Sequence, residues 1–283
     1  MKGCGSVFVV LCPVRPEKGF LKRRKQSKNL ARAPAVLCRE FSAFPFCKVE
    51  FTEEKNGINW DEIEEKCGRY SSRIVAPKSV HLPDGRGLKR YVPTAFLPHL
   101  IFNTAKKIIS EAAVPTDIFC ITVTDRNGLC SSKIHSLLPL CSVVRVVTSK
   151  PEKYADACEK ALDLYGATLI IRPDYEPTHK PDTVICCDGA VSASMSDSAV
   201  FTNRKRTCGK IRFCGSGITL TEKHRDFLPE SIDPLDFAGA LTEFCGCRDY
   251  ADAGFSDIDI SCGKCASPSP EKCLLCHITD THS

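Results

Sequence analysis

The residues of this sequence that could bind a ligand gather where three apolar runs end. Each run is followed at once by polar residues or by a turn, and the candidate residues are Asp125, Gly128, Thr148, Ser149, Lys150, Asp188 and Gly189. Two carboxylates at such ends could share a divalent cation, because hard metals prefer oxygen ligands. Strand-end aspartates are equally common as helix caps and turn formers, so the metal hypothesis and the structural one both stay open.

A second candidate site lies near the C-terminus, in two C-x2-C pairs. The expected ligands are Cys262, Cys265, Cys273 and Cys276. Thiolate pairs at this spacing can hold zinc from tight turns, and four of them suit a tetrahedral ion. Only seven residues separate the pairs, fewer than in a zinc ribbon. The pattern therefore indicates either a zinc or iron–sulfur site or a cysteine-bearing tail without metal.

The first candidate site depends on the strands and helices predicted between residues 117 and 189, where apolar runs alternate with helical patterns. The expected strands are 118–124, 142–148, 167–171 and 183–187, and helical spacing follows the first two. Strands alternating with helices predict βαβ units and a parallel sheet. We therefore predict an α/β fold, a Rossmann-like parallel sheet with helices on both faces, together with a small N-terminal α+β cap and a cysteine-rich tail. Because the carboxyl ends of parallel strands meet at one edge, the candidate residues should line a single crevice.

Residues 117–189 resemble the NAD(P)-binding half of shikimate dehydrogenase and glutamyl-tRNA reductase type proteins. The segments that carry this resemblance are VTDRNGL, VVRVVTSKPEKY and TVICCDG. It implies a dinucleotide site, but the glycine motif G-x-G-x-x-G/A is missing, and Asp125 stands where a phosphate would approach. Thr148, Ser149 and Lys150 replace the acid that binds a ribose hydroxyl, and such residues suit the 2′-phosphate of NADP.

The sequence outside this core is predicted to form further segments. We predict a basic, flexible arm at 1–33, a small α+β domain at 34–114, the Rossmann-like domain at 115–245 and the cysteine-rich tail at 246–283. In the smaller domain, Asn59 should cap a helix that begins at Trp60. Strands are also expected at 210–213 and 218–221, with Gly215-Ser-Gly217 as the hairpin turn between them.

The composition indicates which classes of protein this chain can belong to. Hydrophobic residues make up 43% and charged residues 26% of 283, which is typical of a globular protein. The net charge of +5 comes from residues 15–32, so we do not expect nucleic-acid binding. The apolar run 5–14 is too short to span a membrane and lacks the layout of a signal peptide, and it predicts a strand. Nineteen cysteines, many in apolar positions, favour a reducing compartment, the cytoplasm.

Three hypotheses of function follow. The leading one is a non-enzymatic regulatory or interaction protein on a degenerate nucleotide-binding fold, with a protein or small-ligand partner that the sequence does not identify. The second is an NAD(P)-dependent oxidoreductase that uses the strand-end crevice, with NADP as its cofactor. The third is a metal-binding module that acts through the C-terminal cysteines. Fold alone does not choose among them.

Overall fold

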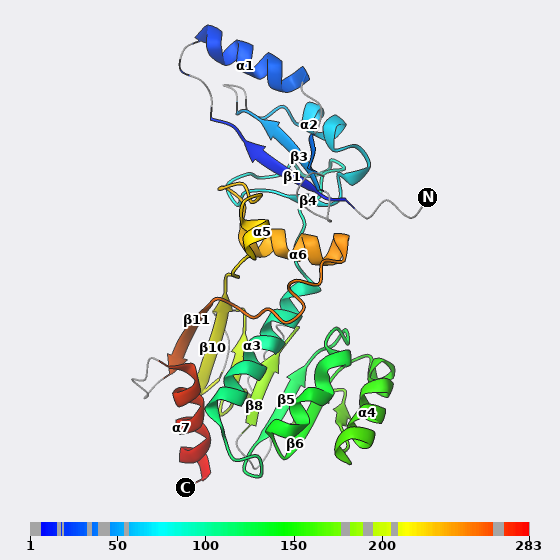
Figure 1. Cartoon of the computed structure of the whole chain (residues 1–283), viewed down its shortest axis with the longest axis vertical. Coiled ribbons are helices and arrows are strands. Elements are labelled where there is room, and N and C mark those ends of the chain that lie inside the picture. Colours follow the sequence, from blue (N-terminus) through cyan, green and yellow to red (C-terminus); the bar gives the residue numbers. More distant parts are fainter. Residues whose placement is uncertain are drawn as a thin grey trace. The chain divides into compact units, whose positions relative to one another are not determined.

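The computed structural model (Figure 1) describes residues 7–15, 18, 20–32, 36–38, 46–53, 57–176, 182–188, 195–204, 209–262 and 269–282. Its contacts divide the chain into two compact units, each built from two separate stretches. The first unit combines Met1–Pro93 with Thr219–Tyr250, and the second combines Thr94–Ile218 with Ala251–Ser283. These boundaries differ from the predicted domains, because residues 219–250 pack within the first unit and residues 251–283 pack within the second.

The first unit is built on a four-stranded sheet in the order β2-β3-β1-β4. Its strands are β1 (Val9–Pro13), β2 (Val36–Cys38), β3 (Phe46–Phe51) and β4 (Ile74–Val75). β1 is parallel to both of its neighbours, and β2 is antiparallel to β3. The expected strand within residues 5–14 is thus present. It lies inside the sheet, with Val9 and Leu11 fully buried, which differs from the flexible arm predicted at 1–33.

Two of the described helices of the first unit begin at a side-chain cap. The helices are α1 (Phe20–Arg32), α2 (Trp60–Cys67), η1 (Gly68–Tyr70), α5 (Glu222–Arg225) and α6 (Pro234–Cys245). Asn59 caps α2 as predicted, since its side chain accepts a hydrogen bond from the Glu62 N–H at 3.4 Å. Asp233 caps α6 in the same way, accepting from the Leu235 N–H at 2.9 Å. The Phe237 ring of α6 packs edge-on against Phe8 and Phe46, with ring centroids 5.9 and 5.3 Å apart. This packing explains why α6, predicted within the Rossmann-like domain, belongs to the first unit.

The second unit contains a seven-stranded sheet in the order β11-β10-β9-β8-β5-β6-β7. Its strands are β5 (Cys120–Thr124), β6 (Val143–Val147), β7 (Ile170–Arg172), β8 (Asp182–Cys186), β9 (Ala199–Thr202), β10 (Ile211–Ser216) and β11 (Asp257–Cys262). All neighbours are parallel except β10 and β11. The four strands predicted from 118 to 187 are present. Counted from β5, the six parallel strands run 3-2-1-4-5-6, the order of a doubly wound sheet.

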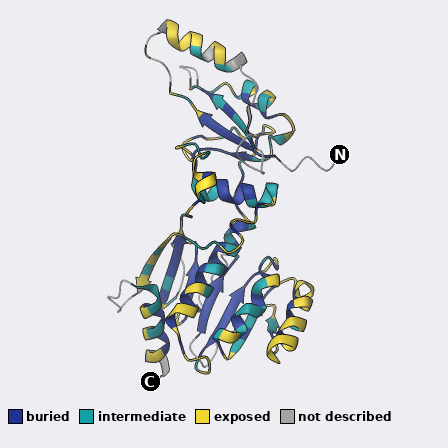
Figure 2. Ribbon diagram, in the orientation of Figure 1, coloured by how far each residue is buried: buried dark blue, intermediate teal, exposed yellow. Residues whose placement is uncertain are grey.

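The described helices of this unit share one core with one face of the sheet. They are α3 (Phe96–Ala112), η2 (Ser131–Leu140, a 3₁₀ helix), η3 (Pro151–Tyr154), α4 (Ala155–Tyr165) and α7 (Pro270–His282). Alternate strand residues such as Ile121, Val144 and Ile185 meet them, and the central strands β5, β8 and β9 are buried throughout (Figure 2). The opposite face carries a smaller cluster to which none of these helices contributes: Val184, Cys186, Met195 and Val200, with Tyr175 packed against them. The prediction of helices on both faces is therefore corrected for the described residues. One cause is the connection between β9 and β10, which is too short for a crossover helix.

The C-terminal region is not a separate tail. β11 pairs with β10 along its whole length, and Cys273, Leu274 and Ile278 of α7 are buried in the core of the second unit. The expected hairpin about Gly215-Ser-Gly217 is wrong, because Gly215 lies within β10 and the strand partner comes from residues 257–262. None of the helices in the described part of the chain is long and apolar enough to cross a membrane.

Candidate functional site

The switch in strand order lies between β5 and β8, at the middle of the second unit's sheet. From β5 the chain proceeds to β6 and β7 on one side, and from β8 to β9 and β10 on the other. Sheets of this kind bind ligands beyond the carboxyl ends of the strands at such a switch. The candidate site is therefore the edge formed by the residues that follow Thr124, Val147 and Cys186.

Backbone hydrogen bonds bring the predicted residues together at this edge. The Asp125 N–H donates to the Val147 carbonyl at 2.9 Å, and the Ser149 N–H donates to the Arg126 carbonyl at 3.3 Å. The Cys187 N–H donates to the Thr124 carbonyl at 3.0 Å. Asp125, Gly128, Thr148, Ser149, Lys150 and Asp188 thus lie on adjoining loops, as the parallel strands predicted. Gly189 lies outside the described residues.

The Asp125 carboxylate is turned into the protein and fully engaged. Oδ1 accepts from the Leu129 N–H at 3.0 Å, and Oδ2 accepts from the Cys130 N–H at 2.7 Å. Oδ2 also accepts from the Tyr154 hydroxyl at 2.7 Å, and Asp125 is 1% exposed. Burial, with the Asp125 charge beside it, raises the pKa of Tyr154, so this hydroxyl stays a donor. The carboxylate therefore occupies the N–H groups of the loop between β5 and η2.

Asp188 is held beside this loop by two hydrogen bonds and one ion pair. Its Oδ1 accepts from the Thr124 hydroxyl at 2.9 Å, and its Oδ2 accepts from the Arg126 N–H at 3.3 Å. The Arg126 guanidinium completes the contact, with Nε 3.8 Å from Oδ2. The carboxylates of Asp125 and Asp188 thus both accept hydrogen bonds from N–H groups of the loop that follows β5. Such contacts are typical of turn-forming aspartates, the structural alternative to a metal site.

The loop after β6 is more open. Thr148 is buried, and its hydroxyl accepts from the Lys150 N–H at 3.1 Å, whereas Ser149 and Lys150 are exposed. Gly128 has φ +65°, and a Cβ there would lie 2.6 Å from Cδ of Lys153. The Lys153 ammonium donates to the Asn127 carbonyl at 2.7 Å. Ser149 and Lys150 are therefore the predicted residues that solvent, or an anionic group, can reach.

Two thiols meet directly beneath the edge, a feature that sequence reasoning missed. Cys130 and Cys187 are buried with their sulfur atoms 3.7 Å apart. Their hydrogen bond lowers the pKa of Cys130, with His99 acting in the same direction, and raises the pKa of Cys187. Cysteines 57 positions apart carry no local spacing signal. Only the alignment of β5 with β8 reveals the pair.

A dinucleotide does not fit this edge as it stands. Its pyrophosphate would need the loop N–H groups, which in dinucleotide-binding sheets point at the phosphate. Here the N–H groups of Leu129 and Cys130 are taken by an internal carboxylate. A phosphate in their place would also meet the negative charge of Asp125 in a buried setting, where like charges repel strongly.

The C-terminal cysteines are only partly described. Cys273 is buried in the core of the second unit, and Cys276, three residues later on α7, is exposed. The backbone of Cys262 ends β11, but its side chain and the whole of Cys265 lie outside the described residues. The proposed four-cysteine site thus stays a prediction.

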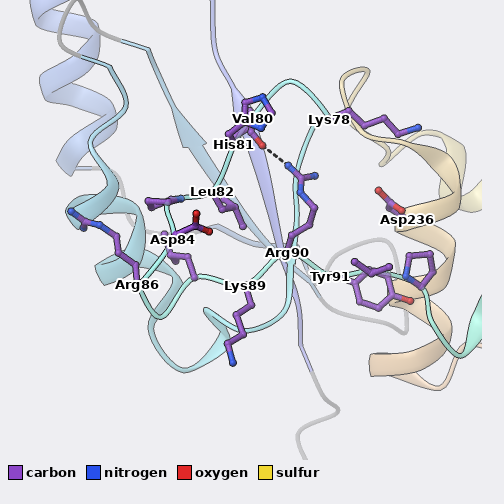
Figure 3. Close-up of a pocket in the computed structure, with 15 residues that line it drawn as sticks. Lys78, Val80, His81, Leu82, Asp84, Arg86, Lys89, Arg90, Tyr91 and Asp236 are labelled. Atoms are coloured by element: carbon purple, nitrogen blue, oxygen red, sulfur yellow. Dashed lines mark hydrogen bonds between the residues drawn. The ribbon is translucent and has the colours of Figure 1, made fainter.

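A cavity of about 620 Å³ opens in the first unit, lined by residues between 78 and 93 and by Asp236 of α6 (Figure 3). Two of its basic side chains bind the protein itself. Arg90 donates to the carbonyls of Ala76 and Pro77 at 2.6 and 3.0 Å and also to that of Val80. The Lys78 ammonium lies 2.6 Å from the Asp233 carboxylate. The cavity is thus framed by structural contacts, and these cations are already partnered.

Comparison with known proteins does not identify a family. No family model matches the chain. No curated protein matches it either. Among solved structures, the chain is similar to L-tryptophan dehydrogenase from Nostoc punctiforme, with 10% identity and a TM-score of 0.29 over 98% of this chain and 79% of that one. At this TM-score no inference is drawn from the likeness.

Proposed function

We propose that this chain is a non-enzymatic regulatory or interaction protein built on a degenerate nucleotide-binding sheet. The observation that supports it is the Asp125 carboxylate, which accepts from the Leu129 and Cys130 N–H groups at 3.0 and 2.7 Å. In this proposal the internal carboxylate takes the place of a phosphate and holds the loop closed. The sheet then serves as a rigid scaffold, and its function lies in what the surface binds.

The test is a thermal-shift titration of the reduced, full-length protein with NAD and NADP. A ligand present at 100 times its dissociation constant stabilises a fold by about 2.7 kcal/mol, which a melting curve detects easily. We expect no shift with either nucleotide at millimolar concentration. A saturable shift with NADP overturns the proposal and promotes an oxidoreductase.

The oxidoreductase alternative has one observation in its favour, the end of β6. Ser149 and Lys150 are exposed there, and no acid occupies the position that binds a ribose hydroxyl. If NADP binds, the Lys150 ammonium is the group placed to meet the 2′-phosphate. Lys150→Glu would then abolish the preference for NADP over NAD, whereas Lys160→Glu, on the exposed side of α4, would leave it unchanged.

The metal-module alternative depends on Cys262, Cys265, Cys273 and Cys276. Metal analysis of anaerobically purified protein tests it, with a double Cys262→Ser, Cys265→Ser variant beside the wild type. Loss of about one zinc equivalent in that variant supports a joint site. Because Cys273 is buried in the core of the second unit, its thiol would have to become accessible for such a site to form.

A further inference from the structure

Three potential metal ligands converge in the first unit, away from the sheet edge and the C-terminal cysteines. They are His224 of α5, and Cys247 and Asp249 in the segment that follows α6. One imidazole nitrogen, the thiol sulfur and one carboxylate oxygen all lie within 4.8 Å of one another. His224 and Cys247 are each 2% exposed, whereas Asp249 faces solvent. The cluster thus has a buried side and an open side.

The helix ends explain why these residues meet. α6 ends at Cys245, and Gly246 adopts φ +69° as its C-cap. The N–H groups of Gly246 and Cys247 donate to the carbonyls of Thr242 and Leu241, both at 3.1 Å. This reversal is a common helix ending, and it directs Cys247 back toward the helix. The thiol is therefore held by backbone geometry.

The imidazole is positioned by two hydroxyl groups. Nδ1 of His224 lies 3.0 Å from the Thr221 hydroxyl and 2.8 Å from the Tyr250 hydroxyl. The same nitrogen is 3.9 Å from Oδ2 of Asp249. Nδ1 is thus the nitrogen that faces the carboxylate. A ring nitrogen carries one lone pair, so an ion bound to Nδ1 would replace these hydroxyl contacts.

A cation already occupies the open side of the cluster. The Lys223 ammonium lies 2.6 Å from Oδ2 of Asp249, and the Lys223 side chain is 57% exposed. A long, exposed lysine can leave at little cost, because an ion pair at the surface stabilises a fold only weakly. The structure therefore shows an anionic position that accepts a positive charge next to a buried nitrogen and sulfur.

We propose that His224, Cys247 and Asp249 bind one divalent transition-metal ion, best matched by Zn²⁺, in exchange for the Lys223 ammonium. Nitrogen, sulfur and oxygen ligands together suit this borderline-soft ion. Zinc bonds of roughly 2.0 to 2.3 Å place tetrahedral ligands about 3.3–3.8 Å apart. Because the three atoms lie within 4.8 Å of one another, they need to close by about 1.5 Å at most. Three protein ligands leave a fourth position for water.

The experiment is a Zn²⁺ titration of the full-length, reduced protein after treatment with a chelator, using a competing chromophoric chelator as the readout. We expect one equivalent to bind, and the Co²⁺-substituted protein should show thiolate-to-cobalt absorption. Cys247→Ser should abolish that absorption, whereas Cys67→Ser, a buried cysteine of the same unit, should retain it. The double Cys262→Ser, Cys265→Ser variant should retain it too, which separates this site from the C-terminal cysteines.

Two exposed positions keep the test decisive if Cys247→Ser fails to fold. Asp249→Asn should weaken Zn²⁺ binding by at least about 10-fold, while Asp84→Asn, another exposed carboxylate of this unit, should not. Lys223→Met should bind Zn²⁺ more tightly than the wild type, because the competing ammonium is gone. Absence of Zn²⁺ binding in the wild type overturns the proposal. So does unchanged affinity in both Asp249→Asn and Lys223→Met.

Discussion

The carboxylate of Asp125 accepts three hydrogen bonds in a position removed from water. A buried charge is costly unless such donors compensate it, and each donor is costly if it loses its acceptor. Asp125 and the groups around it therefore form a unit whose parts depend on one another. Its residue type could be recognised in the sequence, but its inward direction could not, because Tyr154 lies 29 residues away.

Asp125→Ala should destabilise the protein by about 2–4 kcal/mol, because the Leu129 and Cys130 N–H groups and the Tyr154 hydroxyl would lose their acceptor. Urea unfolding at pH 7 measures the loss. Asp163→Asn, an exposed position on α4, is the control and should change stability by less than about 0.5 kcal/mol. Equal effects of the two substitutions would show that the Asp125 contacts contribute nothing.

Asp182, at the start of β8, provides a pH-dependent test. Burial raises its pKa to about 6, against hydrogen bonds from Tyr175 and Thr122 that favour the ionised form. In the unfolded chain the pKa is about 3.9. Between these values the folded state binds more protons, so the contribution of Asp182 is fully present below about pH 4 and is lost as the pH rises through 6. The loss is on the order of 2–3 kcal/mol.

Asp182→Asn removes this titration while keeping the size of the side chain. The difference in unfolding free energy between variant and wild type should therefore shift in favour of the variant as the pH rises from 4.5 to 7.5. Urea unfolding across that range measures this difference. The control is Asp174→Asn, which changes an exposed carboxylate eight residues earlier in the sequence. A difference that stays constant with pH would contradict the raised pKa.

At the scale of elements, local signals predicted what local contacts determine. The runs that became β5, β6 and β8 are apolar because each strand is covered by neighbours in a parallel sheet. The cap at Asn59 could be predicted for the same reason, since its hydrogen bond reaches only three residues along the chain. The order of the strands also brought the candidate edge together as expected.

Long-range pairings were not readable from the sequence. β11 pairs with β10 although about 40 residues separate the two strands in the sequence, and no local pattern indicates this pairing. Nor does a spacing signal connect His224 with Cys247 and Asp249, although C-x-C at 245–247 is visible. Residues 218–221 alternate like a strand and are not one, because β11 already occupies the free edge of β10.

Gly215 tests how closely β10 is covered. A Cβ at this position would lie 1.9 Å from Cδ2 of the Phe255 ring, so the ring must move. Gly215→Ala should therefore destabilise the protein by more than about 2 kcal/mol, through overpacking. Gly246→Ala is the contrast: its φ is +69° but nothing lies within 4 Å, so only backbone strain of about 1–2 kcal/mol is expected. Chemical unfolding of both variants distinguishes them, and a smaller effect at Gly215 would contradict the close packing.

At the scale of the whole molecule, each unit is completed by a segment distant in sequence. The first unit takes α5 and α6 from residues 219–250, and the second takes β11 and α7 from residues 251–283. A division of the chain into consecutive domains therefore cuts through both cores. For this reason, domain boundaries predicted from the local sequence pattern placed α6 in the Rossmann-like domain, whereas it packs in the first unit.

The discontinuous first unit predicts how fragments behave. A fragment of residues 1–93 lacks α6, so Phe8 and Phe46 would lose the ring of Phe237 that packs against them. We expect this fragment to unfold without cooperativity and to bind a hydrophobic dye, whereas residues 1–93 joined to 219–250 by a flexible linker should unfold cooperatively. Circular dichroism during urea unfolding measures both. Phe237→Ala in the joined fragment is the matched control, and removing a buried ring of this kind costs about 3–5 kcal/mol. Cooperative unfolding of the 1–93 fragment alone, at the midpoint of the joined one, would mean that α6 is not part of this core.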